Sequence, residues 1–124
     1  MSDQHQETIF VYGTLRRHGS NAFRMDGATF LGHASALGLL YRVEWYPGAI
    51  FDSCAETSIV GELYQITKEH LQALDDFEGD EYQRVNILTI TPNGPVKASA
   101  WQYRRPVERL TRMQTGDWLK EYHP

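Results

Sequence analysis

The segment TIFVYGTLRRHG, residues 8–19, constrains the fold of this chain more than any other stretch. Residues 8–12 are apolar and β-branched, which is typical of a buried strand. The strand ends at Gly13, where the missing side chain lets a ligand approach the main chain closely. The small and polar residues that follow leave backbone N–H groups at the surface, where they can bind the oxygen atoms of a ligand. We therefore expect an oxygen-binding loop directly after this strand.

The remaining sequence predicts several strands and only two or three short helices. The clearest signal is a hairpin, because the strand-like segments 82–91 and 96–104 flank the turn-forming residues 92–95. Gly32 and Gly38 are expected to bend or bulge the weaker strands around them. After the first strand we expect a helical turn at 21–25, two weak strands within 29–43 and a strand at 58–66. A helix capped by Thr67 should then run from Lys68 to about Phe77. The hairpin follows, and then a short helix that begins at Pro106 and that Gly116 closes.

These elements predict an α+β fold in which a small mixed β-barrel is flanked by short helices. A closed or nearly closed barrel hides the strand edges that a chain of this size would otherwise expose. The strands do not alternate regularly with helices, which argues against a doubly wound parallel sheet of the Rossmann type.

The length of 124 residues predicts a single domain, which we expect to span 8–124 after a disordered N-terminus at 1–7. The net charge of −4 argues against a general nucleic-acid-binding protein, and no apolar run approaches the length of a membrane span. The only cysteine, Cys54, cannot form an intrachain disulfide and is expected to be a small core thiol. No signal peptide is visible, so we expect a cytoplasmic protein.

One acidic side chain stands apart from the carboxylates of residues 75–81. On a helical wheel of about 100° per residue, Leu71, Leu74 and Phe77 form one apolar stripe. Glu78 lies roughly 40° from the centre of that stripe, so its carboxylate should point toward the core, and Gly79 should end the helix there. Desolvation in such a place raises the pKa of a glutamate toward the range useful for proton transfer. Glu78 is therefore the candidate general acid/base, and the alternative is an ordinary carboxylate at a frayed helix end.

Other side chains carry weaker signals. Arg16, Arg17 and Arg24 could bind a substrate carboxylate, although a solvated loop is the more common setting for each of them. Tyr103, on the return strand of the hairpin, could direct its hydroxyl into a cavity or simply pack in the core. The histidine spacings do not match a metal site, and neither a P-loop nor a GxGxxG motif is present.

Together these segments resemble the gamma-glutamylcyclotransferase-like superfamily. FVYGTLRRHGSN is similar to its N-terminal YG(S/T)L motif, and LDDFEG followed by Tyr82 and Arg84 is similar to its acidic motif. WYPGAI, VGELYQI, WQYRRP and GDWL further resemble the small bacterial YtfP-like branch, and LDDFE is closest to the gamma-glutamylamine cyclotransferases. The resemblance extends from about residue 8 to residue 120.

The resemblance implies a small β-barrel with helices around it and a cavity at the YGTL loop. It also implies that a gamma-glutamyl group is cyclised to 5-oxoproline without a cofactor or metal, with release of an amine or amino acid. The acid/base glutamate of the family falls on Glu78, with Glu81 as a second candidate three residues on, and a cavity-lining tyrosine falls on Tyr103. The substrate-cradling loop falls on Tyr12, Gly13, Thr14 and Leu15.

Three functions remain open from the sequence. The first is a gamma-glutamyl or gamma-glutamylamine cyclotransferase that uses Glu78 and takes a small-molecule substrate. The second is a non-catalytic module of the same fold that binds a small carboxylate or amino-acid-like ligand. The third is a related acyl transferase that passes the glutamyl group to a larger amine. The sequence specifies neither the leaving amine nor the oligomeric state.

Overall fold

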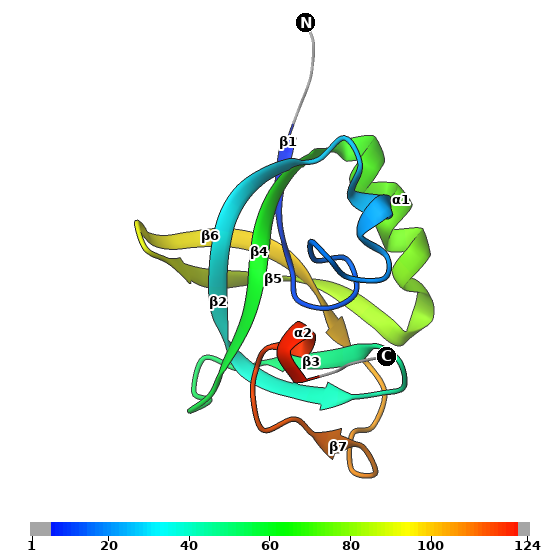
Figure 1. The fold of residues 1–124 in the computed structure, drawn as a ribbon, viewed down its shortest axis with the longest axis vertical. Coiled ribbons are helices and arrows are strands. Elements are labelled where there is room, and N and C mark those ends of the chain that lie inside the picture. The colour runs from blue at the N-terminus through cyan, green and yellow to red at the C-terminus, as the bar shows by residue number, and fades with distance from the viewer. Residues whose placement is uncertain (1–5, 122–124) are drawn as a thin grey trace, which may run out of the picture.

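The computed structural model describes residues 6–121, which form one curved, seven-stranded sheet with short helices around it (Figure 1). None of the helices within this range is long and apolar enough to cross a membrane. The strands are β1 (Gln6–Val11), β2 (Thr29–Arg42), β3 (Pro47–Phe51), β4 (Ser58–Thr67), β5 (Tyr82–Thr91), β6 (Gly94–Tyr103) and β7 (Thr111–Arg112), and the helices are α1 (Lys68–Glu78), α2 (Trp118–Glu121) and two short 3₁₀ turns, Ala22–Met25 and Gly79–Glu81.

The sheet closes into a barrel of five strands in the order β2-β4-β1-β6-β5, and a pairing of Ser35 with Ile90 joins β2 to β5. All neighbours in this ring run antiparallel except β1 and β6, which are parallel. The extra strands β3 and β7 both pair with the C-terminal end of β2. The predicted α+β barrel with flanking helices is therefore confirmed.

Strand β1 is apolar throughout its C-terminal half because both of its faces are buried. Phe10 packs inside the barrel, in a cluster that also contains Trp118 of α2. Ile9 and Val11 point the other way, into a second cluster that includes Leu71 of α1. This second cluster fills the space between the barrel and α1, which lies along the outside of the sheet in Figure 1. The sequence of a strand that is buried on both faces is a continuous apolar run, as predicted for residues 8–12.

The two ends of α1 form as expected from the sequence. The hydroxyl of Thr67 accepts a hydrogen bond from the backbone N–H of His70 at 3.1 Å, which caps the first turn. Gly79 follows the last helical residue with a φ of 68°, a left-handed conformation that glycine adopts easily, and its N–H donates to the carbonyl of Asp75. Glu78 is thus the last residue of the helix.

The N-terminal part of the chain differs from its prediction in two respects. Residues 29–42 form one strand of 14 residues rather than two, and the register shift that bulges it lies between Phe30 and Gly32. The structure shows no such shift at Gly38, which is paired regularly with Phe51. The boundary of the predicted disordered segment was also wrong, because Gln6 and Glu7 already pair with β4. The rest of that segment, residues 1–5, lies outside the described residues.

The predicted helix from Pro106 to Gly116 is wrong. This stretch instead makes a turn, with the N–H of Leu110 bonded to the carbonyl of Val107, and then the short strand β7. Pairing with β2 keeps the backbone extended, and the N–H of Met113 donates to the carbonyl of Leu40 at 2.9 Å. A Cβ at residue 116 would collide with the carbonyl of Ser58, so glycine is required for contact with β4, and the helix begins only afterwards.

Candidate active site

A cavity of about 240 Å³ opens where β1 ends, beside the C-terminus of α1. Its walls come from four parts of the chain: the end of β1 with the YGTL loop, the turn before β3, the end of α1 with the turn that follows, and one side chain of β6. The lining residues are Phe10, Val11, Tyr12, Gly13, Thr14, Leu15, Trp45, Tyr46, Pro47, Phe77, Glu78, Glu81, Tyr82 and Trp101. The structure therefore brings the two segments singled out in the sequence, 12–15 and 77–82, into one cavity.

Tyr12 fixes one wall of the cavity. Its hydroxyl donates to the carbonyl of Trp101 at 2.7 Å and accepts from the backbone N–H of Ala49 at 3.1 Å, so it links β1 to β6 and β3. Burial, and secondly the negative charge of Glu78, raise the pKa of Tyr12 far above its ordinary value. Tyr12 is consequently a neutral phenol with both hydrogen-bonding roles in use, which suits a structural wall better than a proton carrier.

The loop after β1 is held through its carbonyl groups. The carbonyl of Gly13 accepts from the N–H of Arg16, and that of Thr14 accepts from the N–H of Asn21, whose side chain also donates to the Thr14 hydroxyl. Within residues 6–121, the hydrogen bonds of this loop leave the N–H groups of residues 13–15 unused. A substrate oxygen can therefore bind them without displacing a protein contact.

Gly13 is required by a protein neighbour as well as by any ligand. A Cβ at this position would lie 2.8 Å from Cγ of Pro47, which is closer than carbon atoms pack. The sequence predicted that a ligand approaches Gly13 closely, which stays a prediction, and the contact with Pro47 was not foreseen.

Glu78 lines the cavity from the last position of α1 and is partly buried. Burial, and secondly the charge of Asp75, raise the pKa of its carboxyl from 4.5 to about 8. No side chain or backbone group of residues 6–121 makes a hydrogen bond or ion pair to this carboxyl group. Glu78 is therefore an unbonded carboxyl group with a raised pKa that is open to the cavity, which makes it a candidate acid/base.

Asp75, one helical turn before Glu78, has the opposite environment. It accepts from the Trp101 indole N–H at 2.9 Å and from Arg84 Nε at 3.0 Å. These contacts attach the end of α1 to β5 and β6. They also leave Arg84 paired with Asp75, so that this arginine does not neutralise Glu78.

Glu81, the alternative acid, lines the same cavity, but its carboxylate is already engaged in a hydrogen bond. Its Oε1 accepts from the hydroxyl of Tyr46 at 2.7 Å, and its backbone carbonyl accepts from the N–H of Arg104 at 2.8 Å. The two acids therefore have different settings: Glu78 is unbonded in the cavity, and Glu81 is fixed by a phenol.

The cavity-lining tyrosine of this region is Tyr82 and not Tyr103, which corrects the sequence-based assignment. Tyr103 lies outside the cavity lining, with its ring edge-on to Tyr82 at 5.7 Å between centroids and packed over Gly48. The hydroxyl of Tyr82 donates to the carbonyl of Pro47 and so joins the two walls. Tyr82 directly follows the acidic turn and is the cross-strand partner of Tyr103, and of the two tyrosines only Tyr82 lines the cavity.

The sequence did not place the turn at 43–47 in the site. Trp45 and Tyr46 of this turn both line the cavity, and Trp45 is 50% exposed. Their rings meet edge-on with centroids 4.9 Å apart. Turns are usually polar, so two adjacent aromatic residues before Pro47 are the signal that could have indicated a binding surface.

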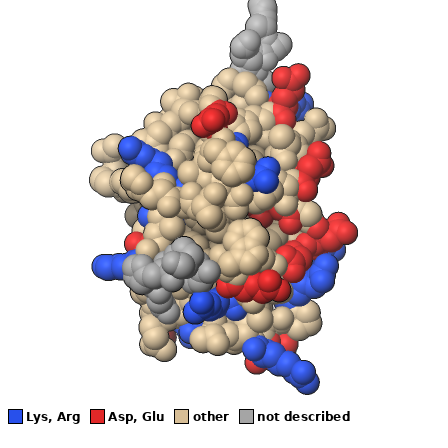
Figure 2. Space-filling view, turned by 45° about the vertical axis from the view of Figure 1, so that its right-hand side comes forward, with Lys and Arg blue, Asp and Glu red and all other residues tan. Residues whose placement is uncertain are grey.

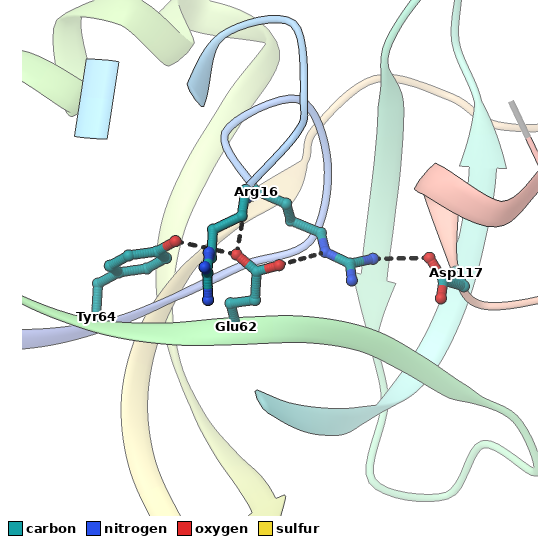
Figure 3. A network of polar contacts seen from close by, with 5 residues as sticks. Arg16, Glu62, Tyr64 and Asp117 are labelled. Atoms are coloured by element: carbon teal, nitrogen blue, oxygen red, sulfur yellow. Dashed lines mark hydrogen bonds and ion pairs between the residues drawn. The ribbon is translucent and has the colours of Figure 1, made fainter. Parts of the chain in front are cut away.

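The arginines of the loop bind protein groups. Arg16 is buried and donates to Glu62 through Nε at 3.2 Å and to Asp117 at 2.7 Å (Figure 3). The guanidinium of Arg17 lies 4.8 Å from the centroid of Phe30, and that of Arg24 lies 4.1 Å from the centroid of Phe77. None of the three lines the cavity, so the interpretation of these arginines as carboxylate ligands is not supported by their positions.

Two further observations concern groups that could react or bind metal. Cys54 is exposed rather than part of the core, because it lies in the loop between β3 and β4. Among residues 6–121, no group of three or more His, Cys, Asp or Glu side chains is arranged to hold a metal ion.

The family model "Gamma-glutamyl cyclotransferase, AIG2-like" matches residues 9–120. The chain belongs to this family. It is 40% identical over 116 residues to the gamma-glutamylcyclotransferase family protein ytfP of Citrobacter rodentium, covering 90% of this chain and 94% of that protein. The solution structure of ytfP from Escherichia coli is 38% identical, with a TM-score of 0.68, and the match covers 90% and 96% of the two chains. The crystal structure of YkqA from Bacillus subtilis is 26% identical with a TM-score of 0.81, and the match covers 94% of this chain and 40% of that one.

Membership of the gamma-glutamyl cyclotransferase, AIG2-like family confirms the resemblance drawn from the YGTL and LDDFEG segments, including its YtfP-like branch. Both segments lie inside the matched range and meet at the cavity. The cavity is therefore the candidate active site of this family member.

Proposed function

We propose that the protein converts a gamma-glutamyl amine or gamma-glutamyl amino acid to 5-oxoproline and a free amine in the cytoplasm, with Glu78 as the general acid/base. The observation that carries the proposal is the unbonded carboxyl of Glu78 in the cavity of the YGTL loop, with its pKa raised to about 8. Family membership supports the reaction class.

The first step needs a base. The α-ammonium group of the substrate must lose a proton before its nitrogen can attack the γ-carbonyl carbon of the same molecule. Glu78 accepts this proton, the new C–N bond closes the five-membered ring, and the γ-carbonyl oxygen becomes an oxyanion. The free N–H groups of residues 13–15 bind oxygen atoms of the substrate, either its α-carboxylate or this oxyanion.

The second step needs an acid. As the oxyanion reforms the carbonyl, the C–N bond to the leaving amine breaks, and Glu78 returns its proton to the leaving nitrogen. The ring nitrogen still carries two protons after its attack, and it gives one of them to water or to the released amine, which leaves the lactam N–H of 5-oxoproline. The enzyme ends in its starting state, and no cofactor or metal is consumed. A pKa near 8 suits both steps, because such a group accepts and donates protons readily around neutral pH.

The test is release of 5-oxoproline from a panel of γ-glutamyl amino acids and γ-glutamyl-ε-lysine. We expect Glu78→Gln to lower kcat/KM by about 10²- to 10⁴-fold, the usual contribution of a general acid/base. Asp76→Asn is the matched control, because Asp76 is an exposed acid of the same helix outside the cavity lining, and it should keep full activity. Turnover that survives in the folded Glu78→Gln variant would contradict the role of Glu78.

The other two functions predict different results in the same assay. A binding module would bind the panel equally well with and without the Glu78 carboxylate and would release nothing. An acyl transferase would consume the substrate only when a second amine is added, and would yield a new γ-glutamyl amide instead of 5-oxoproline.

A further inference from the structure

Arg16 joins the YGTL loop to the C-terminal segment of the chain. It directly follows Leu15, which lines the cavity, while its own side chain is buried outside the cavity lining. Its Nε donates to Glu62 on β4 at 3.2 Å, and its Nη1 donates at 2.7 Å to Asp117, which directly precedes α2 (Figure 3). Glu62 belongs to the barrel wall, so Asp117 is the acid that connects the loop to the C-terminal segment.

The setting of Asp117 differs from that of most acids in this protein. Many acidic side chains are exposed, and Figure 2 shows several of them gathered on the right-hand side of the face that it presents. The side chain of Asp117 is 24% exposed, and the Arg16 side chain that it binds is 8% exposed. A charge-assisted hydrogen bond in such a place is stronger than an ion pair between solvated side chains. Asp117 can therefore hold the guanidinium in one geometry.

The segment that carries Asp117 is anchored independently of this bond. On one side of Asp117, the carbonyl of Gly116 accepts from the backbone N–H of Val60 at 2.9 Å. On the other side, Trp118 is 2% exposed and packs in the barrel interior with Phe10. The carboxylate of Asp117 thus has a defined place between two anchors, and its removal should leave the segment where it is.

The turn that completes the loop has an unfavourable backbone conformation. His18 has a φ of 72°, in the left-handed region that residues other than glycine rarely adopt. The turn is also tight, because a Cβ at residue 19 would lie 2.3 Å from the carbonyl oxygen of Thr14. Such a turn keeps its shape only where the surrounding structure determines it. The carbonyl of Arg16 accepts from the N–H of Gly19 at 2.7 Å, so a displaced Arg16 would displace the turn as well.

We propose that Asp117 is a positioning residue, which acts through Arg16 to hold the N–H groups of residues 13–15 where they bind a substrate oxygen. Asp117 does not line the cavity, so its effect must pass through the loop. The inference rests on the proposed function for its effect on turnover, because that function assigns the substrate oxygen to these N–H groups. A displacement of about 1 Å can cost on the order of 10²-fold in rate, so even a small movement of the loop is measurable.

The kinetic test compares two variants of Asp117. Asp117→Ala removes the bond to Arg16, whereas the amide oxygen of Asp117→Asn can still accept from Nη1. We expect Asp117→Ala to lower kcat/KM by about tenfold and Asp117→Asn to lower it by no more than about threefold. Glu108→Ala is the control, because it removes an exposed acid between β6 and β7, and it should keep full activity. Wild-type kcat/KM in Asp117→Ala would overturn the inference while the proposed function stands.

Amide hydrogen exchange, followed by NMR, separates positioning of the loop from general loss of stability. The N–H of Arg17 bonds to Glu62 and reports on the loop, and the N–H of Val60 reports on the C-terminal segment. In Asp117→Ala we expect the exchange rate of Arg17 to rise by about tenfold relative to that of Val60. Trp118→Phe, which loosens the packing of the segment and keeps Asp117, should accelerate Val60 at least as much as Arg17.

The exchange ratio distinguishes failure of the inference from failure of the proposed function. If the wild type releases no 5-oxoproline, the proposed function fails, and the ratio alone decides the inference because it needs no turnover. If Asp117→Ala does not fold, Asp117→Ser replaces it, since serine suits the position before a helix and its side chain ends one bond short of the atom that binds Arg16. An unchanged ratio in the folded variant means that Asp117 only stabilises the protein, and it overturns the inference.

Discussion

Glu62 and Glu78 both lie close to the loop that follows β1, yet the fold places them in opposite environments. Glu62, on β4, is 2% exposed and accepts hydrogen bonds from Arg16 Nε, the backbone N–H of Arg17 and the Tyr64 hydroxyl (Figure 3). Glu78 has no such partner among residues 6–121 and faces the cavity. The first carboxylate holds the loop to the barrel, and the second carboxylate is left without a bonded partner.

The difference arises from where the arginines are bound. Arg16 is bonded to Glu62 and Asp117, and Arg84 is bonded to Asp75, so the cations nearest to the site in sequence are committed to other acids. Burial without a bonded cation among residues 6–121 leaves the carboxyl of Glu78 with a raised pKa. The comparison teaches that hydrogen-bonding partners, rather than burial alone, separate a glutamate fixed to the barrel from one whose carboxyl group is left open to the cavity.

Removing the charge of Glu62 should have the largest effect on stability. In Glu62→Gln the amide NH₂ replaces one of the two oxygens, so it meets a donor in either orientation: Arg16 Nε at the place of Oε2, or the Arg17 N–H at the place of Oε1. Arg16 also loses one of its two bonded acids. Breaking a buried ion pair from one side costs about 3 kcal/mol of unfolding free energy. Urea denaturation of the wild type and of Glu62→Gln measures this loss of unfolding free energy.

The control for this loss is Glu56→Gln, in the exposed loop between β3 and β4, which should change the unfolding free energy by less than about 0.5 kcal/mol. If Glu62→Gln were as stable as the wild type, the contrast between the two glutamates would not lie in their bonding.

The pH dependence of stability should reveal Glu78. Its pKa in the folded protein, about 8, is above the value of 4.5 from which it is raised, so the folded state binds this proton more tightly than the unfolded state. That contribution is complete below pH 4.5 and is lost as the pH rises through about 8. The wild type should therefore lose about 2 kcal/mol relative to Glu78→Gln between pH 6.5 and pH 9.

Urea denaturation of the two proteins at both pH values measures this difference. Asp76→Asn serves for comparison, because an exposed carboxylate of the same helix should not reproduce it. A constant difference between wild type and Glu78→Gln across this range would mean that Glu78 is ionised in the folded protein like an ordinary surface acid.

The elements that the sequence predicted correctly depend on neighbours along the chain. The apolar run at residues 8–12 indicates β1, and Thr67 caps α1 through a hydrogen bond from the N–H of His70, three residues on. The helical period places Glu78 on the side of α1 that faces the cavity. Local geometry determines each of these, so one segment of sequence suffices.

The features that escaped prediction depend on residues far apart. The bond between Arg16 and Glu62 joins positions 46 residues apart, and the bond between Tyr46 and Glu81 joins positions 35 apart. Tyr103 was assigned to the cavity, and Tyr82 was not, for the same reason: only the closed barrel decides which ring faces the cavity. The helix predicted from Pro106 failed because pairing with β2 outweighed the local signal.

The smallest expected effect concerns Asp75, whose charge adds to burial in raising the pKa of Glu78. In Asp75→Asn the side-chain oxygen can still accept from Trp101 and Arg84, so the end of α1 should stay in place. The lost negative charge lowers the pKa of Glu78, and the rise of kcat/KM with pH should move to lower pH by roughly half a unit. A purely structural role for Asp75 would lower the rate at every pH and leave the midpoint unmoved. The pH profile of kcat/KM therefore tests whether the fold tunes Glu78 through the acid one turn away, as well as by withholding an arginine from it.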